Sequence, residues 1–272
     1  MSTATRRFAD LTTAEVGTAL SRDSVLVLPT GAVEPHGPHL PMSTDLVVAE
    51  ELSSSVVDAG AAAGHDVWLL PALAYTKSDE HAALPGTMWT RATTFFETLV
   101  DIGASIVGTP ARRLLVINAH GGNSALLEVA ARELRRRFGL QTFFAWGPAA
   151  PGPTERGLGI HAGWAETSIM LHLRPDLVNM SAARACVADA VADCEHVGFN
   201  KTIRFGWLST DFSESGVIGD PTGATATIGQ VLFADRVAEL VAALGEVASF
   251  DPGRVRADGP RPAGTHPGGI DA

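Results

Sequence analysis

The stretch RLLVINAHGGNS, residues 113–124, combines the two patterns that decide the fold. Its first half is dominated by large apolar residues, which is typical of a strand covered on both faces in a mostly parallel sheet. Its second half places His120 directly after that strand, where two glycines allow a tight turn into the next helix. Ligands of open α/β sheets gather at the carboxyl ends of the strands, so this histidine predicts a site as well as a fold.

The same strand pattern recurs on either side of this stretch. Three further short apolar runs predict strands at 24–29, 67–70 and 141–146. Amphipathic stretches predict helices at 44–59, 92–107, 124–138, 163–173 and 224–250. Thr90 and Asn123 are the expected N-caps of the second and third of these helices, and Gly139 ends the third. The alternation is the βαβ pattern and predicts an α/β fold, a single domain whose mostly parallel central sheet is flanked by helices on both faces.

The domain is expected to span residues 1–250. Residues 251–272 are rich in proline and glycine and have no apolar period, which predicts an extended or disordered C-terminal tail. The length of 272 residues fits one α/β domain as easily as two small ones, so it does not settle the domain count. The hydrophobic fraction of 46% suits a globular protein with a sizeable core.

Charge and composition exclude several classes of function. A formal net charge of −10 argues against a nucleic-acid or anionic-membrane partner. The N-terminus has no apolar signal region and no run is long enough to span a bilayer, so the expected location is the cytoplasm. The sequence contains no G-x-S-x-G elbow and no glycine-rich nucleotide fingerprint after the first strand, which disfavours a serine hydrolase and a dinucleotide enzyme.

Three segments carry ligand-type side chains next to predicted strands or helices. Glu34 and His36 lie two apart after the first strand, so in an extended segment they point to the same side. Asp45 opens the next helix and can fold back over the same pocket. His120 follows the third strand. Glu166 lies early in the helix at 163–173, where a glutamate is more often solvent-facing or capping, so the residues alone leave its role open.

These segments resemble the creatininase family of metal-dependent amidohydrolases. The family pattern runs Gly-x-x-Glu-Gln-His-Gly-x-His-Leu-Pro…Thr-Asp, then Asn-Gly-His-Gly-Gly-Asn, then His-Ala-Gly-x-x-Glu-Thr-Ser. This chain has GAVEPHGPHLPMSTD at 31–45, NAHGGN at 118–123 and HAGWAETS at 161–168. EHAALPGT at 80–87 and GVIGDP at 216–221 resemble two further family motifs.

The resemblance implies a homohexamer with two divalent metal ions per chain. Carried over by position, Glu34 and His120 bind one ion, His36 binds the other, and Asp45 bridges them. Creatininase has a glutamate two residues after the equivalent of His120, where this chain has Gly122, so the remaining ligand role is assigned to Glu166. Mixed nitrogen and oxygen ligands favour Zn²⁺, Fe²⁺ or Mn²⁺.

The implied chemistry is amide hydrolysis by a metal-bridging hydroxide, because metals lower the pKa of bound water toward about 7. His161 is expected to carry the proton to the leaving nitrogen, and Glu166 is the second expected catalytic residue. The expected substrate pocket is lined by Lys77, Ser78, His81, Gly121, Gly122, Asn123 and Trp164.

The function predicted first is hydrolysis of a non-standard or cyclic amide C–N bond in a small molecule. One alternative is a peptidase-type member that processes the C-terminus of a modified peptide, as in mycofactocin-like maturation. Another is a metal-binding homologue without catalytic activity.

Overall fold

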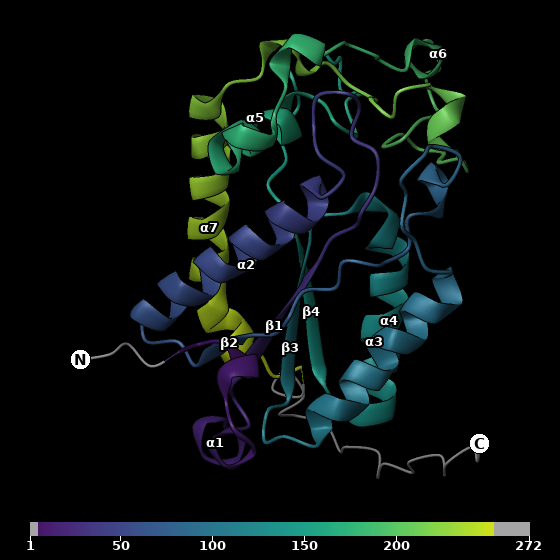
Figure 1. Cartoon of the computed structure of the whole chain (residues 1–272). Helices are drawn as coiled ribbons and strands as arrows, with labels where there is room; N and C mark the ends of the chain where they lie inside the picture. The colour runs from purple at the N-terminus through teal and green to yellow at the C-terminus, as the bar shows by residue number, and fades with distance from the viewer. Residues whose placement is uncertain (1–4, 253–272) are drawn as a thin grey trace.

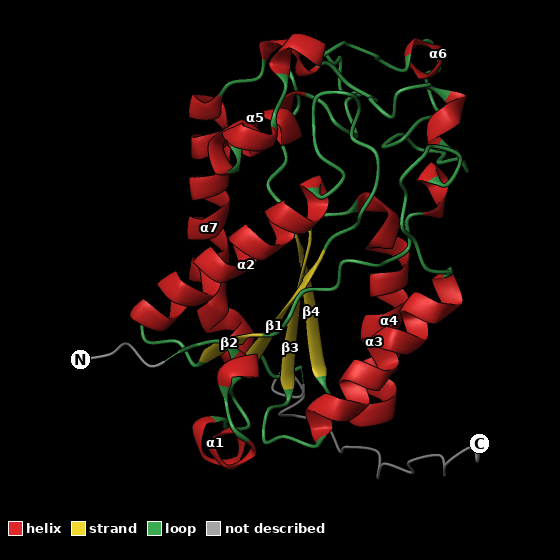
Figure 2. Cartoon of the chain, in the orientation of Figure 1, coloured by secondary structure: helices red, strands yellow, loops and turns green. Residues whose placement is uncertain are grey.

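The computed structural model describes residues 5–252 and is built around a four-stranded parallel sheet (Figures 1 and 2). The strands are β1 (Val25–Thr30), β2 (Val67–Leu69), β3 (Arg113–Asn118) and β4 (Gln141–Trp146), in the order β2-β1-β3-β4. All three pairings are parallel, so the described sheet is entirely parallel rather than mostly so. The predicted strands agree with the observed ones to within a residue at each end.

The burial of the strands explains why their sequences read as unbroken apolar runs. Every residue of β1, β2 and β3 is buried, whereas β4 lies at the edge of the sheet and is only partly covered. Successive side chains point to opposite faces, so each central strand contributes to two cores. Val25 and Val27 of β1 join one hydrophobic cluster, and Leu26 and Leu28 join the other.

Helices cover both faces of the sheet, as predicted. The helices of the described chain are α1 (Thr13–Ala19), α2 (Thr44–Ala62), α3 (Ala92–Val107), α4 (Ser124–Phe138), α5 (Trp164–Leu173), α6 (Asp189–Ala192) and α7 (Ala226–Ser249). The residues of α2, α5 and α7 pack on one face, and α3 and α4 pack on the other (Figure 1).

The helix ends differ from the predicted caps in two places. Arg91, not Thr90, is the N-cap residue of α3, and it makes no side-chain capping bond. Asn123 is the N-cap residue of α4 as predicted, but its side chain makes no capping bond and donates instead to Asn118 Oδ1, 3.1 Å away. Gly139 ends α4 as expected, with a φ of 68° that favours glycine. Helix α1 was not predicted, although Thr12 and Glu15 form a capping box, a pattern that can be recognised from the sequence alone.

Long loops cover the carboxyl ends of the strands, in the upper part of Figure 2. Isolated bridges between His161 and Ile218 and between Cys186 and Gly219 tie these loops together. The predicted tail lies, from residue 253 onward, outside the described residues. Within residues 5–252, no helix has the length and apolar character needed to cross a membrane.

Candidate metal centre

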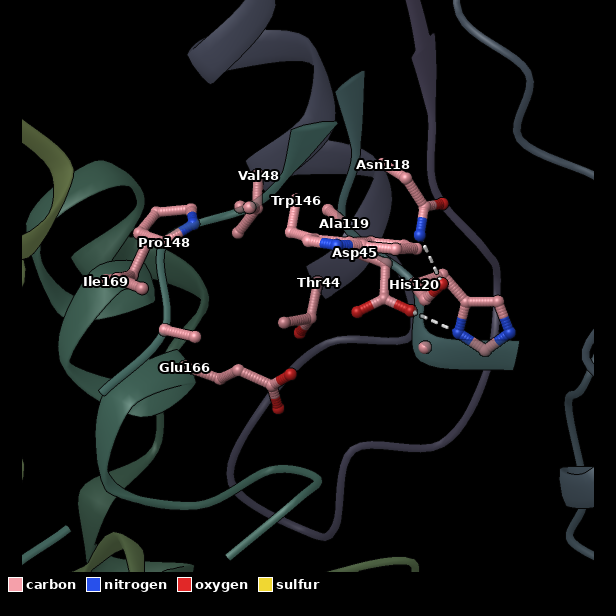
Figure 3. A pocket seen from close by; sticks show the side chains of 13 residues that line it. Thr44, Asp45, Val48, Asn118, Ala119, His120, Trp146, Pro148, Glu166 and Ile169 are labelled. Atoms are coloured by element: carbon pink, nitrogen blue, oxygen red, sulfur yellow. Dashed lines mark hydrogen bonds and ion pairs between the residues drawn. The ribbon is translucent and has the colours of Figure 1, made fainter. Parts of the chain in front are cut away.

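The five predicted metal ligands come together at the carboxyl edge of the sheet. They arrive from four segments: Glu34 and His36 follow β1, Asp45 lies in the first turn of α2, His120 follows β3, and Glu166 lies in the first turn of α5. The first four are buried, and the side chain of Glu166 is 29% exposed. Figure 3 shows Asp45 beside His120, with Glu166 across the pocket from them.

Asp45 is the centre of this arrangement. Its Oδ1 lies 3.0 Å from His36 Nε2, and its Oδ2 lies 3.0 Å from His120 Nδ1. Three groups of side chains place one ligand atom each within 4.8 Å of one another: Glu34 with Asp45 and His120, His36 with Asp45 and Glu166, and Glu34 with His36 and His161. Glu34, His36 and Asp45 each belong to two of the groups. Asp45 also turns a different oxygen toward each of two histidines, as a bridging carboxylate would.

Backbone carbonyls orient the histidine rings of the site. His36 Nδ1 lies 3.1 Å from Glu34 O, His120 Nε2 lies 2.8 Å from Lys77 O, and His161 Nε2 lies 2.8 Å from Pro35 O. A carbonyl oxygen only accepts, so the ring nitrogen facing it must carry the hydrogen. In the neutral rings, the other nitrogen then presents its lone pair to the carboxylates, which is the orientation of metal-ligating histidines.

Two buried carboxylate oxygens lack the partners that burial normally requires. Glu34 Oε1 and Asp45 Oδ2 accept no hydrogen bond from any described residue. A buried charge without such partners is costly unless a cation compensates it. Together with the imidazole nitrogens, these oxygens form a donor set that fits Zn²⁺, Fe²⁺ or Mn²⁺.

The charges in the cluster stabilise one another. Burial raises the pKa of Glu34, but the positive charges of His120, His161 and His81 together outweigh it and hold that pKa well below the ordinary value. Burial lowers the pKa of His36, but the carboxylates of Asp45, Glu166 and Glu34 together outweigh it and raise that pKa to about 10. The carboxylates therefore favour positive charge on the neighbouring nitrogens, and a divalent cation competes with protons for the same positions.

A cavity of about 610 Å³ lies over the cluster, and four of the seven predicted substrate-pocket residues line it. Lys77, His81, Gly121 and Gly122 line it, together with His161. The other three predicted pocket residues lie elsewhere, as follows.

Ser78 is buried and donates to Glu34 Oε2. Asn123 is also buried, and its Oδ1 accepts a hydrogen bond from the Lys77 backbone N–H at 3.3 Å. It therefore supports the cavity wall without lining it. Trp164 lines a smaller hollow beside Glu166.

The structure adds site residues that the motifs did not reveal. Glu80 fills the space beside Gly122: a Cβ at residue 122 would overlap the Glu80 carboxylate and His120 Nε2. The only sequence signal for Glu80 is its place in the EHAALPGT segment. The residues of 199–207 that line the cavity carry no such signal; they are Phe199, Asn200, Arg204, Phe205, Gly206 and Trp207.

The sequence pattern of the family described as "Creatininase: Creatinine amidohydrolase" matches residues 9–244 of this chain. The chain belongs to the creatininase family. The match spans the whole sheet and all segments that supply the cluster, so membership covers the fold and the site together.

Several relatives match most of the creatininase-family region. A mycofactocin precursor peptide peptidase from Mycolicibacterium smegmatis is 33% identical over 228 residues, covering 82% of this chain and 87% of the relative. A protein of the same name from Mycobacterium tuberculosis is 36% identical, covering 79% and 82%. The creatinine amidohydrolase of Pseudomonas putida is 34% identical, covering 58% and 67%.

Solved creatininase structures share the fold. One crystal structure of creatininase has a TM-score of 0.72 at 23% identity and covers 91% of this chain and all of the other. Related creatininase structures are described as manganese and zinc–zinc forms.

Proposed function

We propose that this creatininase-family hydrolase is a two-metal amidohydrolase of the peptidase type, which cleaves an amide bond near the C-terminus of a modified precursor peptide. The observation that carries the proposal is the buried cluster around Asp45, where candidate ligand atoms of two groups share one carboxylate at the floor of an open cavity. The small-molecule amide predicted first from the sequence is the second candidate.

Two observations favour the peptide over the small molecule. The relatives named as precursor peptide peptidases match 79–84% of the chain, whereas the creatinine amidohydrolase matches 58%. The cavity, at about 610 Å³, is in the size range of sites for drug-sized ligands and offers room for a peptide segment.

The chain supplies ligands and proton-transfer groups for this reaction. Glu34, His36, Asp45, His120 and Glu166 would hold the ions, which supply polarisation of the amide carbonyl and activation of water. Glu166 is fixed by a hydrogen bond from the Ala162 N–H and remains partly exposed toward the hollows where substrate would lie.

His161 has two possible roles. Its ring centroid lies 4.1 Å from that of His36, and its Nδ1 lies 3.7 Å from Glu34 Oε1, so it is placed either to move a proton to the leaving nitrogen or to bind an ion. Substitution His161→Ala separates the two roles: loss of turnover with unchanged metal content supports proton transfer, and loss of metal makes it a ligand.

The first test is the metal content of protein purified without chelator, beside the variants Glu34→Gln and Glu166→Gln. We expect about two ions per chain in the wild type and fewer in both variants. Zinc- and manganese-loaded protein is then offered peptides with free C-termini and small cyclic amides. Cleavage of the cyclic amides alone would select the small-molecule function. Stoichiometric metal without any hydrolysis would support the alternative of a metal-binding homologue without catalytic activity. No bound metal after reconstitution would overturn the proposal.

The assembly and the location are part of the same proposal. We expect a homohexamer in the cytoplasm, and size-exclusion chromatography with light scattering measures the assembly directly.

A further inference from the structure

One cation on the wall of the large cavity has no partner among the described residues. Lys77 and Arg204 are the Lys and Arg residues that line this cavity in the described chain. Lys77 Nζ is neutralised by Asp79, at 3.1 Å, and by Glu80. Arg204 is exposed and makes no hydrogen bond or ion pair with any residue in the range 5–252. No described residue therefore compensates its charge, in a cavity that the candidate metal ligands also line.

The backbone that carries Arg204 is held in place. Ile203, the preceding residue, donates from its N–H to His196 O at 2.9 Å and accepts from the Gly198 N–H at 3.0 Å. Lys201 Nζ donates to the backbone oxygens of Val191 and Cys194. These contacts hold the short loop immediately before Arg204. The backbone position from which the Arg204 side chain extends is therefore fixed.

Aromatic rings support the same wall. The centroid of Phe199 lies 5.8 Å from that of Phe205, with the rings stacked, and 5.7 Å from that of Trp207. Phe212 packs against Phe199 at 5.3 Å from behind. The wall thus combines packed aromatic rings with one guanidinium that has no partner among residues 5–252.

We propose that Arg204 binds the carboxylate of the substrate, so that the cavity selects amides whose leaving fragment ends in a free C-terminal carboxylate. The proposal rests on the proposed amidohydrolase function of the same cavity. A guanidinium presents two parallel N–H donors that match the two oxygens of a carboxylate. The single positive charge of the guanidinium matches the single negative charge of a carboxylate. Asn200 lines the same cavity and offers a further polar side chain. With the substrate carboxylate bound at Arg204, the amide bond to be cleaved would lie at the cluster on the cavity floor.

The test measures binding, so it does not depend on turnover. Zinc-loaded protein is titrated calorimetrically with N-acetyl-alanyl-phenylalanine and with its C-terminal amide. We expect the acid to bind the wild type at least about tenfold more tightly than the amide, because hydrogen bonds to charged groups carry that much free energy. In Arg204→Gln we expect the two ligands to bind equally, with the amide unchanged from wild type.

Arg132→Gln is the matched control. Arg132 is also an exposed arginine without a partner among residues 5–252, but it lies on α4 and does not line the cavity. We expect this variant to keep the full preference for the acid. Circular dichroism of each variant checks that the fold is retained.

Two results would overturn the inference. A wild type that binds acid and amide equally has no carboxylate site in this cavity. An Arg204→Gln variant that keeps the preference places the carboxylate elsewhere, for example on the metal ions. If zinc-loaded protein cleaves no amide yet prefers the acid through Arg204, the proposed function fails and the carboxylate site stands.

Discussion

The carboxylates of Asp45 and Glu155 are both buried, but their surroundings are opposite. Asp45 lies among ring nitrogens, and its Oδ2 accepts no hydrogen bond from the described chain. Glu155 lies among glycines and accepts three backbone hydrogen bonds at 2.9 Å, from the N–H groups of Gly152, Trp164 and Asp220. A Cβ on Gly159, Gly163 or Gly219 would overlap its carboxylate.

The difference separates a structural carboxylate from one that is free to bind a cation. Backbone N–H groups satisfy Glu155 completely, and it thereby joins the loop at 152–155 to the start of α5, which carries Glu166. Asp45 keeps an oxygen without a hydrogen bond, 3.0 Å from His120 Nδ1, so a bound cation would stabilise this buried carboxylate. Both groups shape the site, but only Asp45 should respond to metal.

The largest expected effect is the loss of metal-induced stabilisation in Asp45→Asn. At a free zinc concentration about a thousandfold above its dissociation constant, binding should raise the free energy of unfolding of the wild type by about 4 kcal/mol. The variant should lose most of this gain, because two of the ligand groups share Asp45. Thermal unfolding with and without zinc measures the gain. Glu128→Gln, on the exposed side of α4, is the control and should behave as wild type. An unchanged gain in Asp45→Asn would remove Asp45 from the site.

Glu155→Gln should destabilise the protein to the same extent with and without zinc. The amide replaces one acceptor oxygen with a donor, which leaves backbone N–H groups unsatisfied and should cost about 3 kcal/mol. Urea unfolding in the two metal conditions measures this loss. If the loss appeared only with zinc, Glu155 would belong to the metal site rather than to the structural carboxylates.

A smaller effect is expected from Gly122→Ala, which tests whether Glu80 fills the space beside His120. The added methyl would meet Glu80 and His120 Nε2, and such overpacking should lower the free energy of unfolding by about 1–3 kcal/mol. Gly121→Ala is the matched control, because a Cβ there meets no atom within 4 Å. Equal stability of the two variants would show that Glu80 moves away at no cost.

The last expected effect is the pH dependence contributed by His39, in the same loop as His36. Burial, with the charge of His36, lowers the pKa of His39 from 6.5 to about 4. Between these values the unfolded chain binds a proton that the folded chain does not, so the stability from His39 is present above pH 6.5 and is lost as the pH falls toward 4. His39→Gln should therefore give a shallower fall in the free energy of unfolding from pH 6.5 to 4.5. Identical slopes would mean that His39 is protonated in the fold.

Local patterns accounted for most of the fold. The strand 113–118 was predicted residue for residue, because a central strand is buried on both faces and must be apolar throughout. The cap at Thr90 was wrong, because Arg91 holds that position. Asn123 is the N-cap residue of α4 as predicted, but its side chain makes no capping bond because tertiary partners take it. It binds Asn118 and Gly31 instead of the end of α4.

The sequence by itself determined the family, the parallel sheet and the chemical types of the ligands, because these depend on short motifs at strand and helix ends. Only the tertiary structure decided which atoms face one another. Glu80 reaches the space beside Gly122, and Glu155 accepts from the backbone N–H of Asp220. Arg204 lines the cavity without a partner among the described residues. These contacts join segments far apart in the chain, and local periodicity carries no information about which distant backbone will lie against a given side chain.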